Sequence, residues 1–244
     1  MAIQNLSGKS ALVTGGARRI GREIALEFAR AGADVSITYR TSKAEAAQTV
    51  QGIEALGRRV QAIECDVRSE ASVRKAVAAA AAFHGRIDVL VNNAAVFESV
   101  PLDQITLDQW NTVFETNARG PFLVTREAIV HLRQARGRVI NIGSLGGIHA
   151  WSGHAHYCAS KAALHMLTQA MAKAFAPEVS VNCVAPGWIE LGGSSREGAA
   201  RFAARTPMKR NGTAADVAEA VLFFAANSAY VTGQILAVDG GLGL

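Results

Sequence analysis

The chain of 244 residues is poor in the residue types that cross-link or interrupt a fold, with three cysteines, five prolines and 6% aromatic residues. Cys65, Cys158 and Cys183 are odd in number and show no CxxC spacing, which argues against a disulfide framework and a zinc site. We interpret them as reduced thiols of a cytoplasmic protein, and we expect no metal ion. Because no Pro- or Ser-rich linker divides the chain, we predict a single domain over residues 1–244.

Long apolar runs and clustered charges are also missing. The longest wholly apolar run, 76–83, is far shorter than the roughly 20 residues of a membrane helix. The N-terminal residues lack the pattern of a secretory signal, so we expect neither secretion nor a membrane partner. The formal net charge is +5, but the basic residues are dispersed and aromatic residues do not interleave with them. We therefore expect a small-molecule partner, for which anions are candidates, and no nucleic acid.

What the sequence does contain is an alternation of short β-branched runs with longer helical patterns. The runs are continuously apolar, as in parallel strands that are covered on both faces. Strands are predicted over Ser10–Thr14, Val35–Tyr39, Val60–Glu64, Val89–Val91, Val139–Ile142, Val179–Val184 and Ile235–Val238. Helices are predicted over 19–31, 43–56, 70–84, 104–134, 154–176 and 213–226. This α/β order predicts a doubly wound sheet that binds its ligand at the carboxyl ends of the strands, where strand order reverses.

The first predicted strand runs into a glycine-rich turn, Thr14–Gly21. Its glycines let the backbone turn sharply and approach a pyrophosphate, whose charge the N-terminus of the next helix stabilises. Arg18 and Arg19 stand where that helix begins, and exposed cations there oppose the helix dipole by about 0.3–1 kcal/mol each. A bound phosphate would turn the unfavourable interaction of these arginines with the helix end into a favourable one. The alternative interpretation is that both arginines are simply solvated.

The end of the second predicted strand indicates which dinucleotide would bind. A carboxylate about 20 residues after the glycines holds the ribose 2′-hydroxyl of NAD, whereas a basic residue accommodates the 2′-phosphate of NADP. The sequence reads Tyr39-Arg40-Thr41-Ser42 and has no acid at this end. Arg40, the two hydroxyl groups after it and Arg18 across the turn would suit a phosphate, which favours NADP.

Tyr157 and Lys161 lie four residues apart in a predicted helix and therefore on one face. A free tyrosine has a pKa of about 10, and a nearby ammonium is expected to lower the Tyr157 pKa toward the range of acid–base catalysis. Ser144 ends the fifth predicted strand, at the edge that would hold a substrate. Tyr39 and Lys43 have the same spacing but straddle a strand end and a helix start, so we interpret them as a decoy. For Tyr157 and Lys161, the spacing alone also fits an ordinary solvent-exposed pair of side chains.

Motifs along nearly the whole chain resemble the short-chain dehydrogenase/reductase family. The matching segments are, in the family's order, Thr14–Gly21, Asp66-Val67, Asn92-Asn93-Ala94-Ala95, Asn117, Ser144, Tyr157 with Lys161, Pro186-Gly187, Thr232-Gly233-Gln234 and Asp239-Gly240-Gly241. Each motif is weak alone, but the set is specific. The resemblance implies a seven-stranded Rossmann sheet with helices on both faces and an NAD(P)-dependent oxidoreductase.

The resemblance also implies residue roles. Ser144 would hydrogen-bond the substrate carbonyl, and Tyr157 would donate the proton in reduction or accept it in oxidation. Lys161 would bind the nicotinamide ribose and lower the tyrosine pKa, and Asn117 would hold a water that connects Lys161 to solvent. The expected cofactor residues, with Asp66 and Val67 flanking the adenine, are Gly15, Arg18, Arg19, Ile20, Gly21, Tyr39, Arg40, Thr41, Ser42, Asp66, Val67, Asn93, Ala94, Ala95, Tyr157, Lys161, Pro186 and Gly187.

Two departures from the family pattern leave the substrate open. Arg19 replaces the middle glycine of TGxxxGxG, and together with Tyr39–Ser42 this is similar to pteridine reductases. Those enzymes commonly place aspartate where Ser144 stands, and a serine fits reduction of a 3-oxoacyl thioester or small ketone. The other departure, NNAA for NNAG at Ala95, is minor. An NADPH-dependent carbonyl or enoyl-type reductase is favoured, with a pteridine or dihydropterin reductase and a non-catalytic NADP-binding regulator as alternatives.

Three features remain open on the sequence alone. His149, His154, His156 and His165 cluster near the presumed site, where they are candidates for substrate contact; His154 and His156 would diverge if one helix includes both. The segment 188–207, with its paired glycines, resembles the mobile substrate lid of the family. The family pairs its helices across two-fold axes, and we expect a homotetramer.

Overall fold

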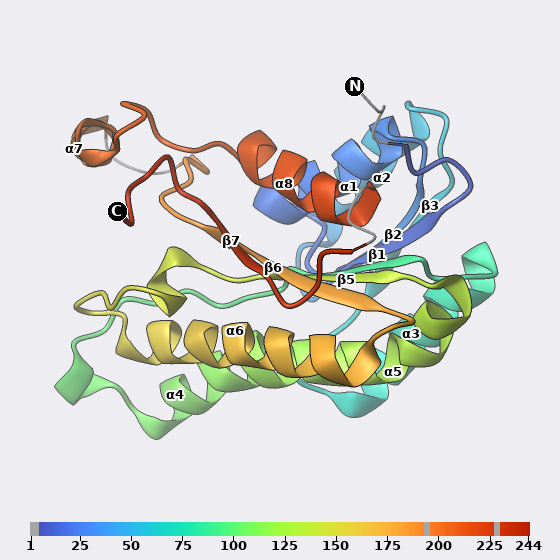
Figure 1. Ribbon diagram of the computed structural model, residues 1–244, viewed down its shortest axis with the longest axis horizontal. Coiled ribbons are helices and arrows are strands. Elements are labelled where there is room, and N and C mark those ends of the chain that lie inside the picture. The colour runs from blue at the N-terminus through green and yellow to red at the C-terminus, as the bar shows by residue number, and fades with distance from the viewer. Residues whose placement is uncertain (1–4, 193–195, 227–229) are drawn as a thin grey trace.

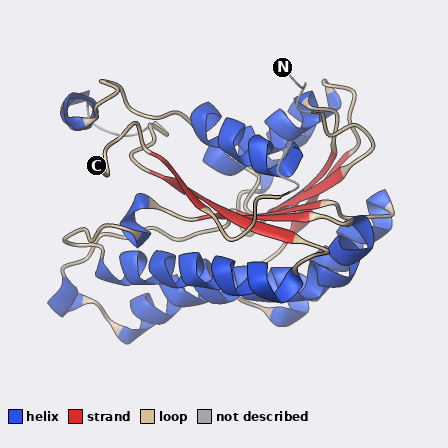
Figure 2. Ribbon diagram, in the orientation of Figure 1, coloured by secondary structure: helices blue, strands red, loops and turns tan. Residues whose placement is uncertain are grey.

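The computed structural model describes residues 5–192, 196–226 and 230–244. Its centre is one sheet of seven parallel strands in the order β3-β2-β1-β4-β5-β6-β7 (Figure 2). The strands are β1 (Ser10–Val13), β2 (Asp34–Tyr39), β3 (Val60–Glu64), β4 (Val89–Asn92), β5 (Arg138–Ile142), β6 (Ser180–Pro186) and β7 (Ile235–Val238). Strand order reverses between β1 and β4, and the predicted doubly wound, seven-stranded sheet is confirmed.

Helices cover both faces of the sheet (Figure 1). α1, α2 and α8 lie on one face, and α3, α4, α5 and α6 lie on the other. The helices are α1 (Arg19–Arg30), α2 (Lys43–Glu54), α3 (Glu70–His84), α4 (Leu107–Phe114), α5 (Gly120–Ala135), α6 (Ala155–Phe175), α7 (Arg196–Arg205) and α8 (Ala214–Ala226). No helix in the described part of the chain is long and apolar enough to cross a membrane.

Successive residues of β1 show why the sheet needs helices on both faces. Ala11 and Val13 pack in one core with Ile24 and Phe28 of α1, whereas Leu12 lies in the other core. All five side chains are at most 2% exposed. Burial of a large apolar side chain stabilises the fold by roughly 1.5–3 kcal/mol. This packing holds the carboxyl ends of the strands, from which the functional loops start, in fixed positions.

A buried chain of polar side chains links the centre of the sheet to α5 and α6. Asn92 and Asn141 face each other in register, and Asn92 Nδ2 donates to Asn141 Oδ1 at 2.9 Å and to Thr125 Oγ1 at 3.0 Å. Asn141 Nδ2 donates in turn to Thr168 Oγ1 of α6 at 2.8 Å. Because a buried amide without partners is costly, these bonds fix β4 and β5 relative to the helix that carries Tyr157.

The helix predicted over 104–134 is present from Leu107 to Ala135, but a π-helical turn (Glu115–Arg119) divides it into α4 and α5. Pro121, in the first turn of α5, has no N–H, so the α-helical hydrogen bond to the carbonyl of Asn117 cannot form. The N–H of Gly120 bonds five residues back instead. Such a widened turn inside a helix is frequent at functional sites.

The other predicted strands and helices agree with the structure to within two residues at each end. The segment 188–207 contains α7, which the sequence analysis does not predict, and its residues 193–195 lie outside the described part of the chain. Phe202 of α7 stacks on Trp188 with ring centroids 3.9 Å apart. This contact joins α7 to the residues that follow β6.

Candidate active site

The loops that follow β1, β2, β3 and β4 line one open cleft at the carboxyl edge of the sheet, on both sides of the reversal in strand order. Its lining includes Gly15, Arg18, Arg19, Ile20, Gly21, Tyr39, Arg40, Thr41, Ser42, Asp66, Val67, Asn93, Ala94 and Ala95. The structure thus brings together the expected cofactor residues that precede Tyr157 in the sequence. Tyr157, Lys161, Pro186 and Gly187 do not line this cleft.

The glycine-rich turn is tied to the loop after β4. Gly15 has a φ of +64°, a conformation that favours glycine, and a Cβ at Gly21 would collide with the Gly15 carbonyl. Thr14 Oγ1 accepts the N–H of Asn93 at 2.9 Å and that of Ala94 at 3.1 Å. Asn93 Nδ2 donates back to the carbonyls of Thr14 and Gly15 at 2.9 and 3.0 Å. These reciprocal bonds hold the two walls of the cleft at the strand-order reversal.

The N-terminus of α1 at this turn suits an anion. Arg18 at the N-cap makes no side-chain capping bond, and the first turn holds no acidic residue. The exposed guanidinium groups of Arg18, Arg19 and Arg40 make no ion pair or hydrogen bond with any residue that the structure describes. Free helix N–H groups beside unpaired cations fit the phosphates of a dinucleotide.

Asp66, which the resemblance places at the adenine, already has a cationic partner. Arg68 Nη2 lies 2.6 Å from Asp66 Oδ2, and Arg68 Nε donates to Oδ1 at 3.0 Å. Hydrogen bonding to Arg68 lowers the pKa of the Asp66 carboxyl, so the group is an anion at neutral pH. An adenine contact would therefore share this carboxylate with Arg68.

Ser144, Tyr157 and Lys161 come together where β5 ends and α6 begins. Ser144 follows β5. Its hydroxyl interacts with the Tyr157 phenol and accepts the N–H of Gly146 at 3.0 Å. The Lys161 ammonium lies 5.8 Å from the centre of the Tyr157 ring. Lys161 is 3% exposed, and its ammonium donates to the carbonyl of Ile142 at 2.7 Å. A hydroxyl, a phenol and an ammonium thus lie together at the strand end.

The pKa of Tyr157 is shifted in the direction opposite to the one expected, because burial dominates. Burial raises the pKa of Tyr157 above its usual value, and the hydrogen bond with Ser144 offsets only part of that increase. Lys161 makes its bond to the main chain, and burial lowers its own pKa to about 8. At neutral pH the site therefore holds a protonated phenol close to an ammonium.

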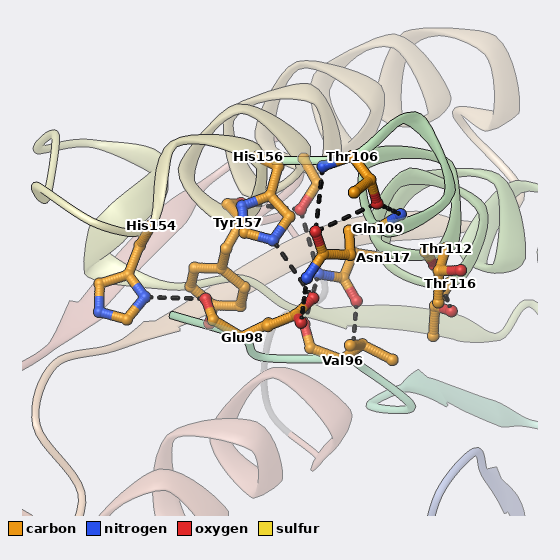
Figure 3. Close-up of polar contacts among 11 residues, drawn as sticks. Val96, Glu98, Thr106, Gln109, Thr112, Thr116, Asn117, His154, His156 and Tyr157 are labelled. Carbon is orange, nitrogen blue, oxygen red and sulfur yellow. Dashed lines mark hydrogen bonds and ion pairs between the residues drawn. The ribbon is translucent and has the colours of Figure 1, made fainter. Parts of the chain in front are cut away.

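Asn117 lies in the π-helical turn and ties the loop after β4 to α6 (Figure 3). Its Oδ1 accepts the N–H of Val96 at 2.8 Å, and its Nδ2 donates to the Val96 carbonyl at 2.9 Å and to Ser160 Oγ at 3.0 Å. Both amide hydrogens are therefore used within the protein. The expected water next to Lys161 would have to bind another atom of this residue.

Glu98 makes a second connection between the same elements (Figure 3). Its Oε1 accepts from Gln109 Nε2 at 2.7 Å, its Oε2 lies 3.6 Å from His156 Nε2, and its carbonyl lies 2.9 Å from His154 Nδ1. Because α6 begins at Ala155, His154 stays outside the helix. The two histidines therefore do not diverge, and both approach Glu98.

Aromatic rings surround Tyr157 on the side of this loop. Phe97 meets the Tyr157 ring edge-on at 4.8 Å and stacks on His154 at 4.7 Å, and Trp151 lies 6.2 Å from Tyr157 in a stacked orientation. The sequence analysis does not single out Phe97, Glu98 or Trp151. The only sequence signal for these three residues is that they lie in the loops after β4 and β5. Such loops stand at the edge of the sheet where ligands bind in this kind of fold.

The remaining expected residues lie as follows. Tyr39 ends β2 and Lys43 begins α2, as expected for the decoy. Pro186 ends β6, and a Cβ at Gly187 would lie 2.6 Å from Asp239 Cβ, so a side chain would not fit there.

All three cysteines are buried and free. Within the described ranges, no three His, Cys, Asp or Glu side chains converge as metal ligands would.

Comparisons with known proteins identify relatives that match nearly the whole chain. The family model described as enoyl-(acyl carrier protein) reductase matches residues 15–243. A 3-oxoacyl-[acyl-carrier-protein] reductase FabG of Staphylococcus epidermidis is 36% identical over 240 residues, which cover 96% of this chain and 98% of that protein.

Two solved structures superpose on this chain with a TM-score of 0.93. One is a blue fluorescent protein from a metagenomic library in complex with NADPH, 39% identical, covering 98% of this chain and 100% of the other. The second is a short-chain dehydrogenase/reductase of Serratia marcescens, 34% identical, covering 98% and 99%. Because sequence and structure both match over nearly the whole length, this chain belongs to the short-chain dehydrogenase/reductase family of NAD(P)-dependent oxidoreductases.

Proposed function

We propose that the chain is an NADPH-dependent reductase of carbonyl compounds with Ser144, Tyr157, Lys161 and Asn117 as its catalytic set. The observation that carries the proposal is the juxtaposition of the Ser144 hydroxyl, the Tyr157 phenol and the Lys161 ammonium, which lies 5.8 Å from the centre of the Tyr157 ring. The raised pKa of Tyr157 keeps its phenol protonated at neutral pH. That is the form required of the proton donor in a reduction.

Each residue then has a role that its position allows. NADPH supplies the hydride when it is bound. Ser144 donates a hydrogen bond to the carbonyl oxygen, and Tyr157 delivers a proton to that oxygen as negative charge develops on it. The Lys161 ammonium stabilises the phenolate that remains and would bind the nicotinamide ribose. Asn117 holds the loop after β4 against α6, which keeps Tyr157 in place.

The cofactor is proposed to be NADPH rather than NADH. Arg18 and Arg40 border the cleft as exposed cations that form no ion pair in the described chain, and residues 40–44 directly after β2 include no acid. A related structure, 39% identical, is a complex with NADPH. A 2′-phosphate would form charge-assisted hydrogen bonds with these arginines, whereas a 2′-hydroxyl would leave them unpaired.

The proposed substrates are 3-oxoacyl thioesters or small ketones. Ser144 supports this choice, because a hydroxyl can donate to a carbonyl oxygen. The relatives include a 3-oxoacyl-[acyl-carrier-protein] reductase, 36% identical. Phe97, 58% exposed beside Tyr157, offers an apolar surface for the substituent of the carbonyl.

A dihydropterin is the second candidate substrate, and a single observation favours it. Arg19, which replaces the family's glycine, lines the cleft with an exposed guanidinium. A guanidinium can hydrogen-bond a flat heterocycle as well as a phosphate. Ser144 in place of an aspartate weighs against this candidate.

The test measures NADPH oxidation with acetoacetyl-CoA, simple ketones, an enoyl thioester and dihydrobiopterin. Tyr157→Phe keeps the ring but removes the donor hydroxyl, so turnover should fall roughly 10²–10⁴-fold. NADPH affinity should change little. Lys161→Ala should reduce both turnover and NADPH affinity, because the ammonium serves phenol and ribose together.

Tyr39→Phe is the matched control, because it alters the decoy tyrosine at the end of β2. It should leave the chemical step unchanged. Loss of turnover in Tyr39→Phe, together with full activity in Tyr157→Phe, would show that the assignment of Tyr157 as proton donor is wrong. Activity only with dihydrobiopterin would replace the proposed substrate class by the second candidate.

A further inference from the structure

One buried histidine close to the proposed site has no part in the chemistry described above. His165 lies on α6 one turn after Lys161 and on the same face, and it is 7% exposed. Its ring fills the space between Gly143 and Gly147, which bracket Ser144. A Cβ at Gly143 would collide with His165 Nε2, and a Cβ at Gly147 would lie 2.6 Å from His165 Cε1. The imidazole therefore packs directly against the turn that presents the Ser144 hydroxyl.

His165 contacts the main chain at both ends of this turn. The N–H of Ser144 donates to Nε2 at 3.4 Å, and the ring packs against the backbone of Gly147. Because Nε2 accepts, the neutral ring carries its proton on Nδ1, the nitrogen on the side of Gly147. Without the ring, the buried N–H of Ser144 would lose this acceptor.

The charge state of His165 agrees with this geometry. A second ring proton would point at the N–H of Ser144, and the cation would lie near the Lys161 ammonium. Burial and Lys161 together lower the pKa of His165 to about 4. The ring is therefore neutral near physiological pH and does not carry protons during turnover.

We propose that His165 is a positioning residue that fixes the Ser144 turn, and hence the direction of the Ser144 hydroxyl, through its hydrogen bond to the Ser144 N–H and its packing against Gly143 and Gly147. Lys161 complements it from the preceding helical turn by bonding to the Ile142 carbonyl. The two side chains of α6 together hold the strand end and the turn after it. The inference rests on the proposed role of Ser144 as hydrogen-bond donor to the carbonyl.

Two substitutions separate hydrogen bonding from packing. His165→Leu fills a similar space but offers no polar atom, whereas in His165→Gln the amide oxygen can accept from Ser144 and the amide nitrogen can donate to Gly147. His84→Leu is the control, because this half-buried histidine at the end of α3 lies outside the site. For each variant the measurements are kcat, KM, NADPH affinity, melting temperature and hydrogen exchange of the segment 143–148.

His165→Leu should lower kcat by about 10- to 100-fold, because a misplaced donor costs rate more than binding. NADPH affinity should be unchanged, and His165→Gln should restore most of kcat. The amides of 143–148 should exchange faster in His165→Leu than in His165→Gln. Equal kcat in the wild-type protein and His165→Leu, or an equal loss in both variants, would mean that the ring only fills space.

The exchange measurement also separates this inference from the proposed function. If the wild-type protein reduced no carbonyl compound while His165→Leu alone loosened 143–148, the function would fail and the structural role of His165 would stand. If the protein were active but 143–148 exchanged alike in all variants, the positioning role would fail and the function would stand.

Discussion

Arg19 shows at the level of one residue how the surrounding fold can override local preference. It has a φ of +54°, in the left-handed region that costs a residue other than glycine roughly 1–2 kcal/mol. Its guanidinium lines the cleft without an ion pair among the described residues. Strained residues persist where the surrounding structure holds them and cluster at functional sites. The sequence shows the missing glycine, but not that the arginine adopts a backbone conformation that favours glycine.

The residue predicted to select the cofactor is Arg40. Arg40→Asp should reverse the preference, because the carboxylate repels a 2′-phosphate and accepts a hydrogen bond from a 2′-hydroxyl. In the wild-type protein NADPH should bind at least about tenfold more tightly than NADH, which corresponds to about 1.4 kcal/mol. Fluorescence titration with both cofactors measures the ratio. Equal affinities in the wild-type protein would refute the assignment.

Lys161 should make activity and stability change in opposite directions with pH. Its pKa falls from 10.5 to about 8 on folding. As pH rises through 8 the ammonium is lost, and kcat/KM for reduction should fall on the order of tenfold per pH unit. Between these two pKa values the unfolded chain binds more protons, so the free energy of unfolding should rise with pH across that window.

A pH–rate profile and chemical denaturation on both sides of the window test this prediction. Lys161→Met should remove the lysine's contribution to the stability slope while inactivating the enzyme. A stability slope that is the same in Lys161→Met and the wild-type protein would show that other groups cause it.

The features of the helices and strands that the sequence predicts correctly are those that depend on local sequence patterns. The strands read as apolar runs because both of their faces are buried, as Leu12 and Val13 show with opposite cores. The π-helical turn at Asn117 is hidden, because apolar periodicity continues across it and only Pro121 signals it. The pairing of Tyr157 with Lys161 follows from helical spacing. The direction of the Tyr157 pKa shift does not, because it depends on burial by residues distant in sequence.

The Glu98 contacts predict that the loop after β4 is held rigid against α6. Glu98→Ala removes the acceptor of Gln109 and the partner of His156. Amide hydrogen exchange over 96–104 should therefore increase several-fold, and the KM for the carbonyl substrate should rise while NADPH affinity changes little. Glu54→Ala, at the exposed end of α2, is the control. Unchanged exchange in Glu98→Ala would show that the loop does not need this carboxylate.

For the whole molecule, we predict a homotetramer in solution. Leu107, Val130 and Met166 are 79%, 59% and 64% exposed, and they belong to α4, α5 and α6 on one face of the sheet (Figure 1). Exposed apolar side chains on adjacent helices mark a surface that a second subunit covers. Met166→Glu should shift the mass measured by light scattering to smaller species, whereas Leu56→Glu beyond α2 should not. A wild-type monomer at working concentration would contradict the prediction.

The unpaired arginines around the start of α1 also bear on how long the protein persists in a cell. Arg18, Arg19 and Arg40 place like charges beside an uncapped helix end, and a bound dinucleotide would relieve their repulsion. A ligand that binds only the folded chain stabilises it by mass action, by about 2.7 kcal/mol when its free concentration is about 100 times Kd. The cellular supply of reduced coenzyme would then set the fraction of unfolded chain offered to proteases. Depletion of the coenzyme would lower the abundance of this enzyme as well as its rate.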